Sequence, residues 1–198
     1  QPSCYSFERY ARFLLAHPGW PGEMGLRRAA ERSLDLGGWS PSTVVAFFHR
    51  FPALTGSGRT RFAEALAATG VREEANAAAR AAWVAGSLST ADEARIITGF
   101  ANALTPSDHN ARMDMLLWQG ARAAAQRQMA LVSPAWQPVF AARLAFRTNA
   151  PDAAERAVAT QQYGAADPGW LADRANWLRS TGASASARTL LAQRPALA

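Results

Sequence analysis

Four dipeptides that place proline directly after a helix-capping residue constrain the fold of this chain most strongly. They are Ser40-Pro41, Thr105-Pro106, Ser133-Pro134 and Asp167-Pro168. In each pair a side-chain oxygen can cap a helix, and proline takes the first helical position, where its missing N–H costs nothing. Alanine, the best helix former, supplies about a quarter of the residues. The pattern predicts a series of short helices.

Apolar residues at helical spacing predict about 10–12 helices between these starts and a set of glycines that favour helix C-termini. The expected stops are Gly70, Gly86, Gly120, Gly164 and Gly182. The expected helices cover about 7–16, 21–36, 41–51, 58–69, 73–85, 90–100, 106–119, 122–130, 134–147, 151–160, 168–181 and 184–192. No segment alternates apolar and polar residues with β-branched enrichment, so we expect an all-α fold without a sheet.

Two of these helix starts carry the capping-box pattern, in which a hydroxyl residue and an acid three positions later each accept a backbone N–H. The first box pairs Ser89 with Asp92, and the second pairs Thr105 with Asp108. The pattern therefore assigns both acids a structural role.

One spacing of leucine, glycine and alanine recurs along the chain. It is seen in Leu66-Gly70-Ala75, Leu116-Gly120-Ala125 and Leu178-Gly182-Ala187. In each copy a helix ends one turn after its leucine, and the next helix presents a small side chain that permits close approach. Such helical hairpins are the units of an α-solenoid, and they need neighbours to bury their apolar faces. We expect one superhelical domain of antiparallel hairpins over residues 1–198, with a soft boundary near 101–106.

The positive charge of the chain comes from arginine, because the sequence contains no lysine. All 21 basic residues are arginine, and the formal net charge is +6. GC-rich codons explain this choice, and selection for the forked guanidinium is the alternative. Either origin predicts attraction to polyanions. No apolar run reaches the roughly 20 residues of a membrane span, the opening QPSCYSFERY does not have the pattern of a signal peptide, and the single Cys4 excludes an internal disulfide.

The sequence offers few groups for catalysis, and we expect no catalytic residue, cofactor or metal ligand. The acidic pairs Glu73-Glu74 and Asp92-Glu93 fall in first turns of helices, where acids complement the helix dipole. The three histidines have neither the spacing nor the neighbours of a metal site. The best surface candidates are Asp108, His109 and Arg112, although the capping box and an i,i+4 ion pair already explain the acid and the arginine.

The seven tryptophans have two interpretations. Core packing between helix layers is the default for most of them. A tryptophan exposed beside arginine would suit stacking on a sugar or a base.

Several blocks of the sequence resemble the helical superhelix of bacterial soluble lytic murein transglycosylases, of the alphaproteobacterial kind. They are HPGWPGE (17–23), FFHRFPALTGSGRTRFAEAL (47–66), ARAAWVAGSLSTADE (79–93), LTPSDHNARMDMLLWQGARAAAQR (104–127) and DPGWLADRANWLRSTG (167–182). The likeness extends over nearly the whole chain and depends on the order of the blocks, since many are capping and packing signals.

The resemblance implies a U- or ring-shaped α-superhelix that accompanies a C-terminal lysozyme-like domain. In the family that domain cleaves murein non-hydrolytically, leaves a 1,6-anhydro end, and carries its catalytic glutamate in a Glu-Ser motif, with Gly-Leu-Met-Gln further on. None of the eight glutamates here precedes serine, and Gly25-Leu26 continues into Arg27-Arg28. No catalytic residue carries over. The resemblance therefore implies a non-catalytic portion that positions peptidoglycan strands for a catalytic domain of the same protein, in the periplasm.

The alternative is a helical-repeat scaffold that binds a protein in its groove. A nucleic-acid-binding solenoid ranks below both. It depends only on arginine content, because clustered basic runs interleaved with aromatic residues are missing, so we expect no nucleic-acid partner.

Overall fold

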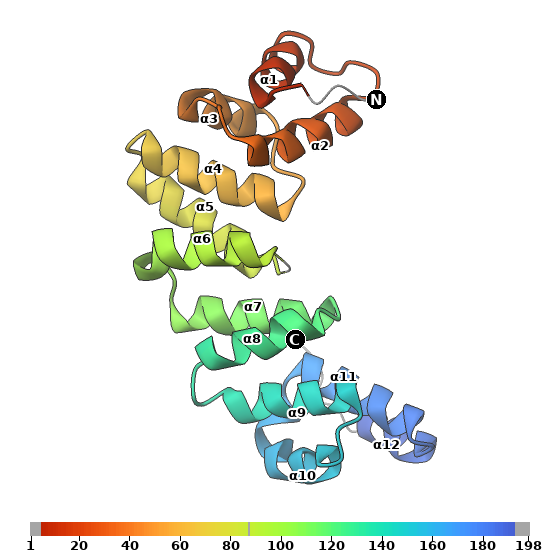
Figure 1. The fold of residues 1–198 in the computed structure, drawn as a ribbon. Coiled ribbons are helices and arrows are strands. Elements are labelled where there is room, and N and C mark those ends of the chain that lie inside the picture. The colour runs from red at the N-terminus through yellow and green to blue at the C-terminus, as the bar shows by residue number, and fades with distance from the viewer. Residues whose placement is uncertain (1–4, 87, 193–198) are drawn as a thin grey trace. The chain divides into compact units, whose positions relative to one another are not determined.

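The computed structural model describes residues 5–86 and 88–192, and over these residues the fold is all-α. Twelve α-helices and three short 3-10 helices account for its regular structure, and no strand occurs within the described ranges. The expected all-α class is confirmed (Figure 1). Cys4 lies outside the described residues.

The chain divides into two compact units, Gln1–Thr105 and Pro106–Ala198. The division falls within the 101–106 segment in which the sequence suggests a soft boundary. The arrangement of the hairpins into a superhelix stays a prediction.

The first unit contains six α-helices that surround two apolar clusters. The helices are α1 (Phe7–Ala16), α2 (Glu23–Ser33), α3 (Pro41–Arg50), α4 (Gly56–Ala68), α5 (Arg72–Val84) and α6 (Thr90–Phe100). In the first cluster, helices α1 to α3 meet where Phe7 packs edge-on against Phe47, with ring centroids 5.3 Å apart. In the second cluster, Leu66, Trp83 and Ile96 join α4, α5 and α6.

The second unit also contains six α-helices. They are α7 (Pro106–Trp118), α8 (Arg122–Gln128), α9 (Gln137–Thr148), α10 (Ala153–Gly164), α11 (Pro168–Ser180) and α12 (Ser184–Ala192). Leu116 and Phe140 belong to the cluster that holds α7, α8 and α9 together. Phe146 and Trp170 pack edge-on, with centroids 5.9 Å apart, in the cluster that joins α9, α10 and α11.

The recurring leucine-glycine-alanine spacing corresponds to one backbone motif, the Schellman C-cap. Gly70, Gly120 and Gly182 have φ of 84°, 69° and 87°, a region that L side chains rarely adopt. The N–H after each glycine donates to the leucine carbonyl five residues earlier, at 3.0, 2.9 and 2.8 Å. The alanine of each copy is buried on the next helix. The motif therefore makes the hairpins α4–α5, α7–α8 and α11–α12.

A fourth hairpin, α9–α10, uses asparagine in place of glycine. Asn149 has φ of 51°, and the Ala150 N–H donates to the Ala145 carbonyl at 3.0 Å. Asparagine tolerates this left-handed conformation better than other non-glycine residues. Aligning the glycines alone could not detect this copy.

The expected start of the helix after Ser133-Pro134 was wrong. Helix α9 begins at Gln137 and not at Pro134, because the Ser133 hydroxyl donates to the Asn110 side-chain oxygen at 3.2 Å, and the Asn110 amide donates back to it at 2.8 Å. The expected stop at Gly164 is confirmed, since Gly164 is the last residue of α10, but it does not adopt a left-handed conformation, and Trp170 packs on it.

The expected caps were correct in part. Asp167 and Ser89 accept N–H groups of Trp170 and Asp92 at 2.6 and 3.1 Å. The Asp92 carboxylate, however, accepts the Ser89 hydroxyl at 2.7 Å. Helix α3 begins at Pro41 as expected, but the Ser40 side chain makes no cap bond.

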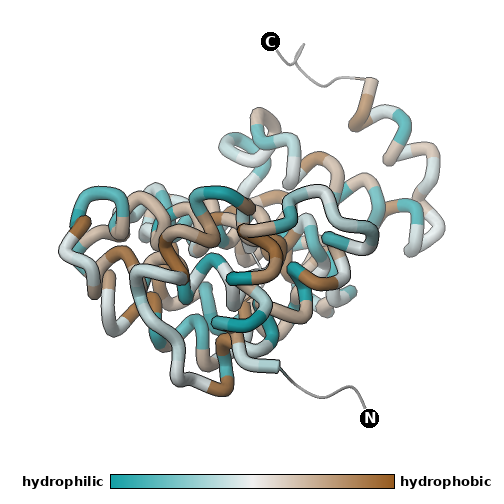
Figure 2. The backbone as a smooth tube through the Cα atoms, turned by 90° about the horizontal axis from the view of Figure 1, so that it is seen from above, coloured by the Kyte–Doolittle hydropathy of each residue, from teal (hydrophilic) through white to brown (hydrophobic). Residues whose placement is uncertain are grey.

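Apolar and polar residues are interspersed along the helices (Figure 2). Among the described residues, no helix has the length and hydropathy needed to cross a bilayer.

Candidate functional site

The three candidate residues from the sequence lie on the first two turns of α7. Arg112 is buried, which contradicts its expected place on the surface, whereas Asp108 and His109 are partly exposed. Burial is the main cause that lowers the pKa of His109; Asp108 opposes this effect and Arg112 adds to it. The Gln128 side chain donates to the His109 carbonyl at 3.1 Å, so this part of α7 is fixed against α8.

The acidic pair Glu73 and Glu74 lies on the surface of the first unit. Glu73 and Glu74 lie in the first turn of α5, as expected, and Glu74 forms a 2.7 Å hydrogen bond with His49. His49 and Glu74 are both about half exposed, so they line no enclosed site.

Three buried acids have their oxygens engaged within the protein. Glu31 accepts bonds from the N–H groups of Leu54 and Thr55 and from the Thr55 hydroxyl, at 2.6–2.8 Å. Asp92 accepts the serine hydroxyl of its own cap. Asp173 is bonded on one oxygen by Arg143 and on the other by Arg147, at 2.9 and 2.7 Å. The hydrogen bonds and ion pairs of these carboxylates give them a structural role. In the described parts of the chain no cluster of three or more His, Cys, Asp or Glu could hold a metal ion.

The tryptophans are less buried than core packing predicts. Trp83 and Trp170 are in the core, Trp39 and Trp177 are half-buried, and three others are exposed. The exposed ones are Trp20, Trp118 and Trp136. Trp20, at 50% exposure, lies among other exposed rings.

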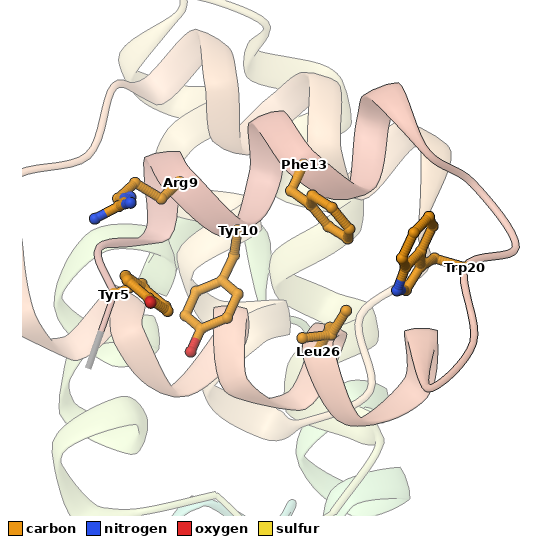
Figure 3. Close-up of a pocket in the computed structure, with 6 residues that line it drawn as sticks. All are labelled: Tyr5, Arg9, Tyr10, Phe13, Trp20 and Leu26. Atoms are coloured by element: carbon orange, nitrogen blue, oxygen red, sulfur yellow. The ribbon is translucent and has the colours of Figure 1, made fainter. Parts of the chain in front are cut away.

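These rings line a cavity of about 390 Å³ between α1 and α2, here called the aromatic hollow. Its lining is Tyr5, Arg9, Tyr10, Phe13, Trp20 and Leu26. Tyr10 and Phe13 point from α1 toward α2, Leu26 points up from α2, and Trp20 closes one end (Figure 3). The hollow therefore combines four aromatic rings with a single charged group.

The shape of the hollow follows from the chain around it. Gly19 N–H donates to the Glu23 carboxylate at 2.6 Å, which ties the α1–α2 connection to the first turn of α2. This connection holds Trp20 edge-on to Phe13, with centroids 5.4 Å apart. At the other end Arg9 lies over the Tyr5 ring, 4.5 Å from its centroid. The rings are thus fixed by ring–ring and cation–π contacts although they face outward.

Sequence reasoning missed this site, although a signal was present. Tyr5, Arg9 and Phe13 recur every four residues. Arg9 and Phe13 lie on α1 beside the buried stripe of Phe7, Ala11 and Leu14, and Tyr5 lies just before the helix begins. A short helix with large side chains on two faces cannot bury both against one layer.

The aromatic hollow can stack flat ligands on its rings and pair an anionic group with Arg9. Its described lining residues include no carboxylate or histidine, and they suit binding rather than proton transfer. Comparison with protein-family models, with curated proteins and with solved structures found no match for this chain.

Proposed function

We propose that this chain is a non-catalytic helical module of a periplasmic peptidoglycan lytic transglycosylase. It binds murein strands and presents them to a catalytic domain of the same protein. The aromatic hollow carries the proposal, because it is an outward-facing set of rings with one guanidinium on an all-α support.

The chemistry of murein fits this lining. The pyranose rings of the glycan present C–H faces that pack on aromatic rings, and their hydroxyls can bond the Tyr5 and Tyr10 hydroxyls. The peptide stems carry carboxylates, which guanidinium groups bind through charge-assisted hydrogen bonds. Arg9 lies at the edge of the stack, where it can reach such a group.

The charge of the whole chain supports the same partner. A formal net charge of +6 attracts an anionic polymer, and dissolved salt screens this attraction. The buried acids support a non-catalytic role, since Glu31 and Asp173 are engaged by hydrogen bonds and ion pairs.

Co-sedimentation with purified sacculi tests the proposal. We expect the chain to sediment with sacculi, less so as salt rises from about 50 to about 300 mM because screening weakens charge attraction. Trp20→Ala should weaken binding about fivefold or more, since one aromatic contact is worth about 1 kcal/mol. Trp136→Ala, which removes an exposed tryptophan from the second unit, is the matched control and should bind like the unaltered chain.

Two results would overturn the proposal. Failure of the unaltered chain to sediment, or equal binding by the Trp20 variant, would remove the hollow as a murein site. Release of anhydro-muropeptides by this chain alone would refute the non-catalytic role.

A protein-binding scaffold is the second candidate, and an apolar hollow on the first unit favours it. This cavity, of about 350 Å³, lies among α3, α4 and α5 and is lined mainly by Phe48, Phe62, Ala78 and Ala81. Ala81→Glu would place a charge on its exposed wall. If a single protein is captured by the unaltered chain, is lost with this variant, and sacculi do not bind, the scaffold function replaces murein binding.

A further inference from the structure

We propose that the second unit has a separate binding site for the C-terminal carboxylate of a short peptide. The site is a cavity of about 320 Å³ between α9, α11 and the α7–α8 turn, here called the arginine hollow. It is defined by Arg122, Phe146, Arg147, Asp173, Asn176 and Trp177. All of these residues belong to the second unit, so the site does not depend on the aromatic hollow or on murein binding.

One wall of the arginine hollow is apolar and fixed. Trp177 stacks on Phe146 at a centroid distance of 5.6 Å and an interplanar angle of 29°. The Trp177 indole N–H donates to the Asn149 side-chain oxygen at 3.1 Å, which sets the orientation of the ring. A half-buried indole face held in this way suits a small aliphatic side chain of a ligand.

The same two helices, α9 and α11, also contribute charged groups to the lining. Among the described residues, Asp173 is the only acid in the lining. Its buried carboxylate is shared by Arg147, at 2.7 Å, and Arg143, at 2.9 Å. Arg143 lies behind the wall and does not line the cavity. It also pairs with Asp114 and Asp167, so it offsets the charge of Asp173 only in part. Arg122, at the start of α8, adds an exposed guanidinium.

This balance selects a monoanion. Within the described ranges, the lining holds the guanidinium groups of Arg122 and Arg147 against one acid, Asp173, which leaves one net positive charge. Arg147 pairs with that acid, and Arg122 is the exposed group that faces a ligand. A carboxylate matches the planar guanidinium fork, whereas a phosphate dianion would bring a second charge toward Asp173. The exposed Asn176 amide can bond the peptide group next to the carboxylate.

The size of the cavity suits a dipeptide. A cavity of about 320 Å³ is at the lower end of the range for small-molecule sites. At about 0.3 kcal/mol per non-hydrogen atom, a ligand of about 14 such atoms binds with a Kd of about 1 mM. N-acetyl-alanyl-alanine is a probe of this size.

NMR titration of the whole chain with this probe tests the site. We expect the Trp177 indole signal to shift with a Kd near 1 mM, while the signal of Trp136 stays in place. The C-terminal amide of the same probe should bind at least tenfold more weakly, and acetate should bind more weakly than the dipeptide.

Two variants and a control separate the site from general charge effects. Arg122→Gln should weaken binding about fivefold to twentyfold and leave the fold intact, because the side chain is exposed. Arg147→Lys keeps the positive charge beside Asp173 but removes the planar guanidinium fork that matches a carboxylate. This variant should also weaken binding of the probe. Arg188→Gln, an exposed arginine on α12, should leave the Kd unchanged.

Equal binding of the acid and amide probes would overturn the inference, as would an unchanged Kd for the Arg122 variant. Tighter binding of inorganic phosphate than of the dipeptide would also overturn it. Since the titration uses no murein, these results are independent of the sacculus experiment.

Discussion

Trp170 packs directly on the backbone of Gly164, so closely that a Cβ at position 164 would come within 2.5 Å of the indole ring. The indole is fully buried, and its N–H donates to the Thr160 hydroxyl at 2.9 Å. Helices α10 and α11 can therefore approach only because position 164 has no side chain. Trp170 also belongs to the apolar cluster that joins α9, α10 and α11.

Gly164→Ala is expected to destabilise the protein by about 1–3 kcal/mol, because the buried indole must move to admit a methyl group. Gly99→Ala is the matched control: Gly99 is exposed within α6 and would meet no atom within 4 Å. The control should gain about 0.5–1 kcal/mol from helix propensity. Urea unfolding measures both, and equal effects would contradict the contact.

Glu31→Gln is expected to cost about 2–4 kcal/mol in the free energy of unfolding. The carboxylate accepts three hydrogen bonds from Leu54 and Thr55, and an amide would turn its NH2 toward one of these donors. Glu73→Gln, on the exposed first turn of α5, should cost less than about 1 kcal/mol. Similar losses in both variants would show that the buried carboxylate has no special role.

Arg143→Gln is expected to destabilise the chain by about 3–5 kcal/mol, because it leaves buried Asp173 with one arginine partner in place of two. Arg143 also pairs with Asp114, and these bonds raise the pKa of its guanidinium against the opposing effect of burial. Arg156→Gln removes an exposed ion pair with Asp152 and should cost at most about 0.5 kcal/mol. A thermal shift no larger than that of the control would refute the buried network.

Stability is expected to rise with pH through the titration of His109. Its pKa in the folded state is lowered, chiefly by burial, so below about pH 6.5 the unfolded chain binds a proton that the folded chain resists. This contribution is present above about pH 6.5 and is lost as the pH falls toward the folded pKa. His109→Gln should flatten the pH dependence of Tm between about pH 5 and 8, and parallel profiles for the two proteins would contradict the shift.

The sequence predicted the helices well where local signals act alone. Pro41, Pro106 and Pro168 start helices because proline there needs no hydrogen bond. The glycines of the recurring spacing end helices because the Schellman turn requires a left-handed residue. These features depend only on residues that are close together in the sequence, so they can be predicted without the tertiary structure.

Local signals misled the prediction where a residue far away in the chain bonds to, or packs on, the residue that carries the signal. Ser133 does not cap a helix, because Asn110, 23 positions away, bonds its hydroxyl. Helix α10 ends at Gly164 as expected, but the reason for a glycine there is the packing of Trp170 and not a left-handed turn. Arg112 has the sequence context of a surface residue but is buried.

The aromatic hollow could be predicted only in part, for the same reason. The stripe of Tyr5, Arg9 and Phe13 is visible in the sequence, whereas Trp20 joins it only through the connection that Gly19 and Glu23 hold in place. The arginine hollow depends on three separate segments, since Arg122, Arg147 and Trp177 come from different helices.

By itself, the sequence determined that this chain is all-α and where most of its helices begin and end, since caps, prolines and glycines act within one turn of the backbone. Only the tertiary structure decided which polar groups are buried and paired and which rings stay exposed. Burial and pairing depend on contacts between residues far apart in the chain, and these contacts override local preference wherever a buried charge or a close approach must be satisfied.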